Sequence, residues 1–337
     1  MIISSYVRPV ARFLKSFHNQ LPIRTMTDEL DKLWESCCFL TRLVASSVKI
    51  SERAGKVIKD VTAGGDLKVV SKGVNDLQTE ADRAAQYCII QSLEKKFGEW
   101  LRVIGEEEKE SVVHELESDV SSEVLALDDR VAPELREITE KDVVVWVDPV
   151  DGTSEFAQGA RDKSSLVEQV TTLIGVAWRG RPVAGIIHQP YYGFETLPPE
   201  QQGRTVWAIK GLPPQGIKVK VDEGVGKRTV VTTRSHSTAL VNDALESLAA
   251  AGLVDEVLRV GGAGYKVLKT MEGSQAYVFA SAGCKKWDTC APEAILEAAG
   301  GRWTPVPRNA LRNGPDVQRM KSGDDVSVVQ RISGYLE

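Results

Sequence analysis

The stretch VVVWVDPVDGTSEF, residues 143–156, decides the fold that we predict for this chain. Its first five residues are apolar and mostly β-branched, which predicts a buried strand, and Asp148-Pro149 ends that strand. Pro149 cannot continue a hydrogen-bonded ladder, and Gly152 adopts backbone angles that other residues resist. Asp148 and Asp151 are therefore expected in a tight turn at the carboxyl end of the strand.

Thr153 and Ser154 follow this turn and supply hydroxyl groups in front of a short predicted helix. The N-terminus of a helix offers free N–H groups and partial positive charge, which suit a phosphate oxygen, whereas nearby carboxylates repel a phosphate unless cations lie between them. The stretch therefore predicts a site for metal and phosphate. These residues alone leave one alternative open, an ordinary Asp-Pro-x-Asp-Gly turn without chemistry.

The composition of the whole chain favours a small-molecule substrate. Its 337 residues suffice for two domains or one large layered domain. A net charge of -5 gives no basic surface for nucleic acid, and no run of about 18 apolar residues is present to span a bilayer. Neither nucleic acid nor a membrane is expected as a partner, and the protein is expected to be a monomer or a homodimer.

The five cysteines predict a reducing compartment rather than a disulfide framework. Their number is odd, they show no framework spacing, and Cys37 and Cys38 are adjacent. Cys284 and Cys290 lack the partners of a zinc site. Residues 1–27 contain basic residues and no acid, which resembles a mitochondrial transit peptide; the alternative is a disordered or loosely packed extension of a cytoplasmic protein.

We predict three parts along the chain: an N-terminal extension at 1–30, a metal-binding α+β domain at 31–212, and an α/β domain at 213–337 that completes the site. The boundary falls at GLPPQG, residues 211–216, where proline and glycine interrupt every periodic pattern nearby.

Helical spacing of apolar residues between Asp31 and Lys59 predicts one or two core helices, which Gly64-Gly65 ends. A short strand is expected at 66–73. Thr79 can then cap a further helix, with Asp82 three residues later. Asp82 is either a capping-box carboxylate, which the spacing favours, or an acid that projects into a site.

Glu106 is the first acid after a predicted strand and a glycine, the same arrangement as at Asp148. Runs of acids usually form a solvated face, so Glu107 to Glu110 are predicted to be exposed. Residues 111–141 are polar and acid-rich, and we expect a loop with helical turns there.

Beyond the central turn, two apolar runs joined at 179–181 predict a hairpin, and RTVWAIKG adds a strand. Later segments alternate between strand and helix. Within RVGGAGYK, residues 259–266, the glycines permit a close backbone approach to a ligand, with Lys266 in the first turn of the next helix. Asp288 is expected near the start of the last long helix, either as its N-cap or as a metal ligand.

Several motifs resemble one superfamily, the lithium-sensitive, magnesium-dependent phosphatases, which include the inositol monophosphatases and fructose-1,6-bisphosphatases. The motifs shared with the whole superfamily are GEE at 105–107, WVDPVDGT at 146–153 and KKWDTCAPE at 285–293. Those that resemble its bisphosphate nucleotidase branch are DLQTEAD at 76–82, IIHQPYY at 186–192, TTRSHS at 232–237 and RVGGAGYK at 259–266.

The resemblance implies a layered αβαβα sandwich of α+β and α/β character with two subdomains. It also implies two or three Mg²⁺ ions, with Li⁺ as an inhibitor. The implied metal ligands are Glu106, Asp148, the carbonyl of Val150, Asp151 and Asp288. The implied water-activating pair is Asp82 and Thr153. The implied substrate-binding positions are Gly152, Thr233, His236, Gly262 and Lys266.

The residues themselves agree with this chemistry. Hard oxygen ligands select magnesium over zinc, and a cluster of carboxylates can hold more than one ion. Other phosphatase designs do not fit, because no cysteine is followed by arginine at the required spacing and DPVDGT lacks the DxDxT interval. The chain departs from the superfamily pattern in its N-terminal extension, in residues 111–141 and in RDKSSLVEQ at 161–169.

The predicted reaction is removal of the 3'-phosphate of adenosine 3',5'-bisphosphate to give AMP and phosphate, with 3'-phosphoadenylyl sulfate considered as a second substrate. Two alternatives stay open. One is an inositol polyphosphate 1-phosphatase, and the other is a non-catalytic nucleotide or lithium sensor that keeps the fold. The sequence does not give the relative rates on these phosphate esters.

Overall fold

The computed structural model describes residues 23–65, 67–73, 76–108, 115–220, 226–235, 237–279, 284–305 and 327–330. The chain divides into two units, Met1–Cys37 and Cys38–Glu337. In the first unit, α1 spans Ile23–Ser36, so the first helix predicted between Asp31 and Lys59 begins earlier. The predictions for residues 1–22 lie outside the described residues. No helix in the described part of the chain has the length and apolar character needed to cross a membrane.

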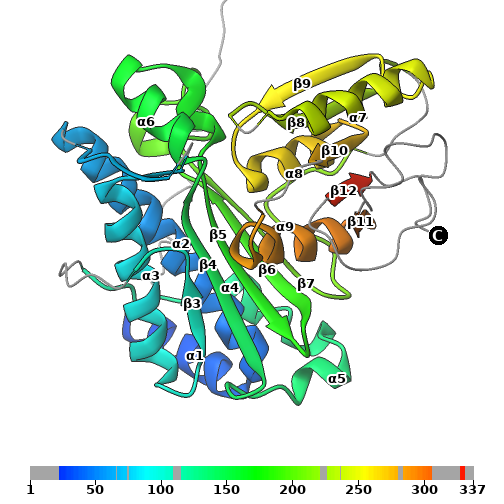
Figure 1. Cartoon of the computed structure of the whole chain (residues 1–337). Helices are drawn as coiled ribbons and strands as arrows, with labels where there is room; N and C mark the ends of the chain where they lie inside the picture. The colour runs from blue at the N-terminus through cyan, green and yellow to red at the C-terminus, as the bar shows by residue number, and fades with distance from the viewer. Residues whose placement is uncertain are drawn as a thin grey trace, which may run out of the picture. The chain divides into compact units, whose positions relative to one another are not determined.

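Two long helices of the second unit, α2 (Phe39–Gly64) and α3 (Glu80–Phe97), lie side by side (Figure 1). The apolar stripe of α2 is buried, as its helical spacing predicts. The helix ends where predicted, because Gly65 adopts a φ of +82° and its N–H bonds to the Thr62 carbonyl. Between the helices, β1 (Val70–Gly73) pairs antiparallel with β2 (Asp76–Gln78), so the single predicted strand is one arm of a hairpin.

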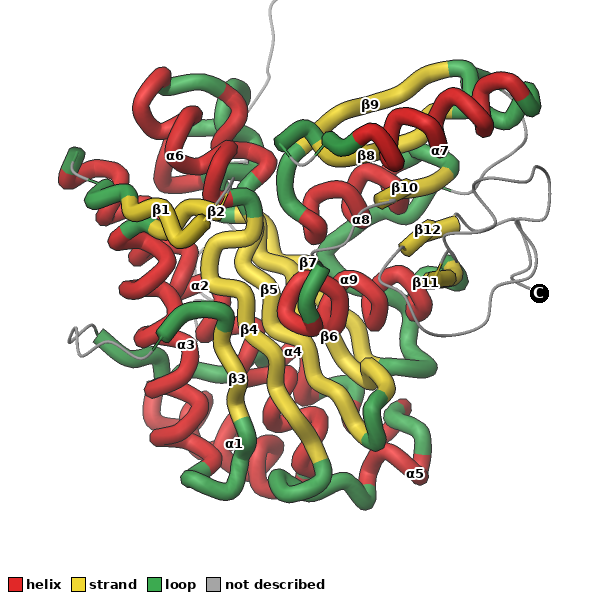
Figure 2. Tube along the Cα trace, in the orientation of Figure 1, coloured by secondary structure: helices red, strands yellow, loops and turns green. Residues whose placement is uncertain are grey.

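The first large sheet has five strands in the order β3-β4-β5-β6-β7 (Figure 2). They are β3 (Val103–Gly105), β4 (Val143–Asp151), β5 (Thr171–Trp178), β6 (Arg181–Gln189) and β7 (Arg204–Ile209). β3 runs parallel to β4, and every later neighbour pair is antiparallel. The predicted hairpin is thus confirmed as β5-β6. The predicted end of the strand at Asp148-Pro149 is wrong, because β4 continues to Asp151 with an irregularity in its pairing with β5 between Asp148 and Asp151.

Short helical segments connect these strands. Residues 115–141 form a loop with helical turns, as predicted for the part of 111–141 that the structure describes. The segments are α4 (Ser122–Leu125), η1 (Asp128–Arg130), α5 (Pro133–Arg136), α6 (Thr153–Asp162), η2 (Ser165–Gln169) and η3 (Pro199–Gln201).

The second large sheet has the order β11-β12-β10-β8-β9. Its strands are β8 (Thr229–Thr233), β9 (Glu256–Val260), β10 (Ala276–Phe279), β11 (Arg302–Pro305) and β12 (Ser327–Gln330). β8 runs parallel to β9 and β10, whereas β12 is antiparallel to both of its neighbours. The helices of this half are α7 (Ala239–Ala250), α8 (Ala263–Glu272) and α9 (Lys286–Ala298).

The second unit has five layers, with α9 and α8 between the two sheets (Figure 1). Along β6, Gly185 lies against α9 and His188 lies against Gly55 of α2, which places these helices on opposite faces of the first sheet. Along β8, Val231 faces the central core, whereas Val230 packs against α7. The predicted αβαβα order is confirmed. One core joins both sheets, and the domain boundary near residue 212 stays a prediction.

Helix α9 approaches the first sheet unusually closely because two paired glycines leave room for its backbone. Gly175 of β5 lies opposite Gly185 of β6. A Cβ atom on Gly175 would lie 2.6 Å from the Ala291 nitrogen, and one on Gly185 would lie 2.4 Å from the Ala291 carbonyl oxygen. The first turn of α9, which carries Asp288, is therefore positioned by contact between helix backbone and sheet backbone.

We expect Gly185→Ala to destabilise the fold by about 1–3 kcal/mol, because the added methyl group meets backbone atoms that cannot rotate away. It should also lower enzymatic activity by displacing Asp288. Urea unfolding at fixed protein concentration measures the first effect. Gly64→Ala is the matched control, since nothing lies within 4 Å of its added Cβ. Equal unfolding midpoints for the two variants would contradict the close packing of α9 on the first sheet.

Candidate metal and phosphate site

One cavity of about 420 Å³ collects nearly all the residues that the sequence nominates. Both halves of the second unit contribute to its wall. The nominated residues that line it are Glu106, Asp148, Val150, Asp151, Gly152, Thr153, Thr233, Gly262, Lys266 and Asp288. Asp82 is buried beside it in contact with Thr153, and His236 lies outside the described residues.

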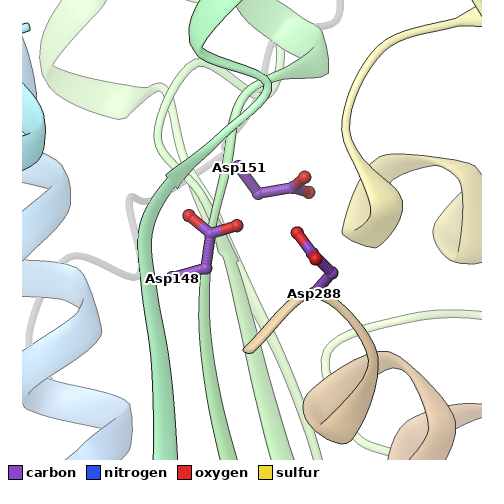
Figure 3. A group of neighbouring side chains, drawn as sticks. All are labelled: Asp148, Asp151 and Asp288. Atoms are coloured by element: carbon purple, nitrogen blue, oxygen red, sulfur yellow. The ribbon is translucent and has the colours of Figure 1, made fainter. Parts of the chain in front are cut away.

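Three carboxylates from two distant segments meet in this cavity. Oxygen atoms of Asp148, Asp151 and Asp288 all lie within 4.8 Å of one another (Figure 3). The first two come from the end of β4, and Asp288 comes from the first turn of α9. Glu106 lines the same cavity outside this group of three. A donor set made only of carboxylate oxygens fits Mg²⁺.

The three-carboxylate cluster carries more negative charge than its surroundings neutralise. Burial raises the pKa of Asp148 well above its ordinary value, and the charges of Glu106, Asp151 and Asp288 raise it further. Burial also raises the pKa of Asp288 to about 7, against the hydrogen bond from the Lys285 N–H, which lowers it. The charges of Asp151 and Glu106 add to the increase. Cations would relieve this repulsion, so the electrostatics fit a metal site.

The carboxyl end of β4 is held by hydrogen bonds between side chains and backbone. The Val150 N–H donates to Asp148 Oδ1 at 3.1 Å, and the Val150 carbonyl accepts from Thr153 Oγ1 at 2.9 Å. Gly152 has a φ of +93° and precedes α6 directly. This backbone angle suits glycine, and it brings the start of α6 to the cavity wall beside the acids.

Asp151 joins the two halves of the second unit. Its carboxylate accepts hydrogen bonds from the N–H groups of Ala263 at 2.7 Å and Gly264 at 2.8 Å, both in the first turn of α8. It also accepts from Thr171 Oγ1 at 2.6 Å. A carboxylate is favourable at a helix N-terminus because of the free N–H groups there. The same side chain thus serves the acid cluster and the attachment of α8.

The glycine turn before α8 packs directly on Asp151. Gly262 has a φ of +59°, and a Cβ atom there would lie 2.8 Å from Asp151 Oδ2 and 2.9 Å from the Gln169 carbonyl oxygen. The Gly261 N–H donates to Gln169 Oε1. The sequence predicts a close backbone approach at these glycines, and the structure shows that Asp151 and Gln169 are what the backbone approaches.

The capping-box interpretation of Asp82 is confirmed, and its interpretation as an acid that projects into the site stays a prediction. Its Oδ2 accepts the N–H and the hydroxyl of Thr79, which completes the capping box of α3. Its Oδ1 accepts from Thr153 Oγ1 at 3.1 Å. Burial raises the pKa of Asp82 to about 7 against the opposing hydrogen bonds from Thr79. One oxygen therefore caps the helix while the other meets the nominated catalytic hydroxyl.

Lys266 and Thr233 lie on the side of the cavity formed by the second sheet. Lys266 is 5% exposed, and its Nζ donates to the Gly262 carbonyl at 2.8 Å and lies 5.3 Å from the centre of the Tyr277 ring. Burial lowers the pKa of this amine. Thr233 is buried at the end of β8. Lys266 is thus no surface lysine, and its ammonium is held at the start of α8.

Two sequence-based predictions need correction. Glu107 is not solvated: it is 7% exposed, its N–H donates to Gln86 Oε1, and its carboxylate accepts from Gln78. Asp288 is not the N-cap of α9, because Lys285 holds that position and its N–H donates to Asp288 Oδ2. In both cases the hydrophobic periodicity of the segment does not show which residue the acid is hydrogen-bonded to.

Sequence reasoning missed an ion pair at the cavity edge. Glu155 lines the cavity, is 1% exposed and accepts from Arg234 Nη1 at 3.1 Å. The second guanidinium nitrogen, Nη2, donates to Gln158 Oε1 at 2.7 Å. The only sequence signal is the polar cluster at 232–237, which contains Arg234 without indicating its partner.

Comparison with known proteins identifies the family. Residues 40–323 match the inositol monophosphatase family. The chain belongs to this family. Members of the inositol monophosphatase family are generally magnesium-dependent and lithium-sensitive.

Relatives within the inositol monophosphatase family differ in their names. The human 3'(2'),5'-bisphosphate nucleotidase 1 is 45% identical over 88% of this chain and 93% of its own length. A putative inositol monophosphatase 3 of Drosophila pseudoobscura is 32% identical over 88% of this chain and 80% of its own length. The extragenic suppressor protein SuhB of Bartonella henselae superposes with a TM-score of 0.58 at 18% identity, covering 86% of this chain and 93% of that one, which confirms the fold.

We expect Asp148→Asn to raise the thermal midpoint in EDTA, because it removes one of the repelling charges while keeping the oxygen that accepts from the Val150 N–H. The same change should remove the stabilisation that added Mg²⁺ gives the wild type. Asp288→Asn should behave alike, and both should lower turnover by more than about a hundredfold. Differential scanning calorimetry with and without Mg²⁺ measures the shift.

Asp142→Asn provides the matched control, since the Asp142 carboxylate accepts a hydrogen bond from the Thr139 N–H and lies outside the cavity. This variant should keep both turnover and the Mg²⁺-dependent shift. Near-normal turnover or an intact Mg²⁺ shift in Asp148→Asn would remove Asp148 from the metal cluster.

Proposed function

We propose that this protein is a Mg²⁺-dependent phosphatase that removes the 3'-phosphate of adenosine 3',5'-bisphosphate to give AMP and inorganic phosphate. The supporting observation is one cavity that is lined both by three clustered carboxylates and by the buried Lys266 of α8. One side suits cations and the phosphate to be cleaved. The other suits a second anionic group. The name of the human relative at 45% identity supports the same substrate.

The residues proposed to hold two or three Mg²⁺ ions are Glu106, Asp148, the Val150 carbonyl, Asp151 and Asp288. Magnesium at such a site supplies activation of water and neutralisation of the charge that develops on the leaving oxygen. The α6 N-terminus adds a place for a phosphate oxygen, because this helix begins at Gly152 without a side-chain cap.

Thr153 and Asp82 are proposed to move the proton of the attacking water. The Thr153 hydroxyl has one proton, which it can donate either to the Val150 carbonyl at 2.9 Å or to Asp82 Oδ1 at 3.1 Å. When it donates to Asp82, a lone pair of Oγ1 can accept a proton from water in the cavity. Asp82, with a pKa of about 7, can receive the proton that Thr153 passes on. Burial of Asp82 keeps competing bulk water away from this carboxylate.

The second sheet and α8 are proposed to bind the part of the nucleotide that does not react. Thr233, Gly262 and Lys266 lie on this side, and Gly152 lies between the two sides. A buried ammonium group that lines the cavity suits the 5'-phosphate. The role of His236 stays a prediction, as do the monomeric or homodimeric state and a cytoplasmic rather than mitochondrial location.

Phosphate release from a panel of substrates with Mg²⁺ tests the proposed function. We expect adenosine 3',5'-bisphosphate to have the highest kcat/KM, with 3'-phosphoadenylyl sulfate, inositol 1,4-bisphosphate and an inositol monophosphate below it. Faster turnover of the inositol bisphosphate would favour the alternative inositol polyphosphate 1-phosphatase. No turnover of any substrate, together with retained nucleotide binding, would favour the sensor.

A lithium arm of the same assay tests the proposed inhibitor. Li⁺ could occupy one of the Mg²⁺ positions without providing the charge that the reaction requires. The rate on the best substrate should therefore fall uncompetitively as Li⁺ is titrated at fixed Mg²⁺. A rate indifferent to lithium would set this chain apart from the lithium-sensitive members of its family.

Lys266→Met should lower kcat/KM for adenosine 3',5'-bisphosphate by roughly ten- to a hundredfold, mostly through KM, because a hydrogen bond to a charged group contributes about 1.5–3 kcal/mol. Methionine keeps the length of the buried stem. Substrates with one phosphate, such as 3'-AMP or an inositol monophosphate, should be turned over almost as before.

The matched control is Lys269→Met, one turn later on α8, where the ammonium pairs with Glu272 outside the cavity. This variant should resemble the wild type on every substrate. Equal losses of kcat/KM on one-phosphate and two-phosphate substrates would assign Lys266 to the hydrolysis step that all substrates share. The proposal that the second sheet and α8 bind the nucleotide would then be withdrawn.

A further inference from the structure

Gln86 holds the backbone next to Glu106 by two hydrogen bonds. This α3 side chain is 3% exposed. Its Oε1 accepts the Glu107 N–H at 2.8 Å, and its Nε2 donates to the Glu107 carbonyl at 2.7 Å. A primary amide that satisfies both groups of one residue acts like a neighbouring strand. Gln86 therefore fixes both the position and the rotation of the chain at this point.

The first sheet holds the same segment from its other side. The Glu106 N–H donates to the Val147 carbonyl at 3.1 Å, one residue before Asp148, and Gly105 lies opposite Val147 in the parallel β3-β4 pair. Glu106 is thus fixed between β4 and Gln86. This arrangement keeps its side chain in the cavity wall with Asp148, whose pKa its charge raises.

Gly105 leaves the space that Gln86 occupies. A Cβ atom on Gly105 would lie 2.1 Å from Gln86 Oε1 and 2.5 Å from its Cδ. Gly105 does not have a positive φ, so its backbone angles accept other residues and the restriction is steric. The glycine of the GEE motif is therefore explained by a partner 19 residues earlier in the chain.

Gln86 also lies four residues after Asp82, on the same face of α3. One helix face thus carries the carboxylate that meets Thr153 and the amide that holds the Glu106 segment. The contact is reinforced by Gln78, whose Nε2 donates to the Glu107 carboxylate. Displacement of this face would move both groups with respect to the cavity.

We propose that Gln86 is a positioning residue of the metal site, which sets the affinity for cations by orienting Glu106. The inference rests on the proposed function in one respect, namely that Glu106 binds metal. Residues that orient metal ligands typically change affinity or activity 10- to 100-fold when they are replaced. Gln86 has this role without contacting the cavity itself.

The test replaces Gln86 by methionine, which has a similar length and no amide. Mn²⁺ binding to the substrate-free protein is measured by EPR of the free ion, and the Mg²⁺ activation constant is measured with the best substrate. We expect both to weaken by roughly tenfold or more, while the substrate KM at saturating Mg²⁺ changes little. Gln91→Met on the same helix is the control, since Gln91 donates to Glu94 of the same helix.

A double-mutant comparison tests the fit between Gln86 and Gly105. Gly105→Ala alone should weaken Mn²⁺ binding because the added methyl group displaces the Gln86 amide. Gln86→Ala removes the obstacle together with the clamp. Gln86→Ala/Gly105→Ala should therefore bind Mn²⁺ no more weakly than Gln86→Ala, whereas independent effects would multiply.

Unchanged Mn²⁺ affinity in folded Gln86→Met would overturn the inference. If this variant does not fold, Gln86→Asn replaces it, because the shorter side chain adds no charge and withdraws the amide from the Glu107 backbone; Mn²⁺ affinity equal to that of the wild type would then overturn the inference. Failure of the proposed function has a different signature. In that case the wild type lacks Mg²⁺-dependent phosphate release, although Mn²⁺ binding still responds to Gln86.

Discussion

The contact between the backbone of α9 and the paired glycines of the first sheet is the constraint on which the site depends. The Ala291 backbone rests on Gly175 and Gly185, and the Cys290 side chain also lies against Gly175. A bulkier residue at either glycine would lift the helix and carry Asp288 away from the acids of β4. Two strand positions are therefore glycine, although glycine weakens a strand, because only glycine lets α9 approach closely enough to fix the distance between the carboxylates.

The acids that this contact brings together repel one another, so other interactions must offset that repulsion. Asp151 accepts from two N–H groups of α8, and Asp82 is shared between the Thr79 cap and Thr153. The continuous core between the sheets adds the burial that holds both halves in place. Each acid thus has a structural partner apart from any cation, which allows the cavity to exist before ions bind.

Sequence patterns predicted the elements because burial and periodicity are local. The apolar run before Asp148, the helical stripe ended by Gly65 and the glycine turn at Gly262 all appear as expected. Errors arose where a distant partner decides the environment. Glu107 is buried by Gln78 and Gln86, and Glu155 pairs with Arg234 from the other sheet. No spacing rule within one segment contains that information.

The central layer has a consequence for synthesis of the chain. The first sheet is complete once residue 209 has been made, but α9, which covers one of its faces, begins only at residue 286. At about 5–20 residues per second, the ribosome needs roughly 4–16 s to make the intervening chain. During that interval the apolar face of β5 and β6 lacks this cover, and transiently exposed apolar surface favours aggregation. Assembly of the carboxylate cluster is consequently a late event of folding.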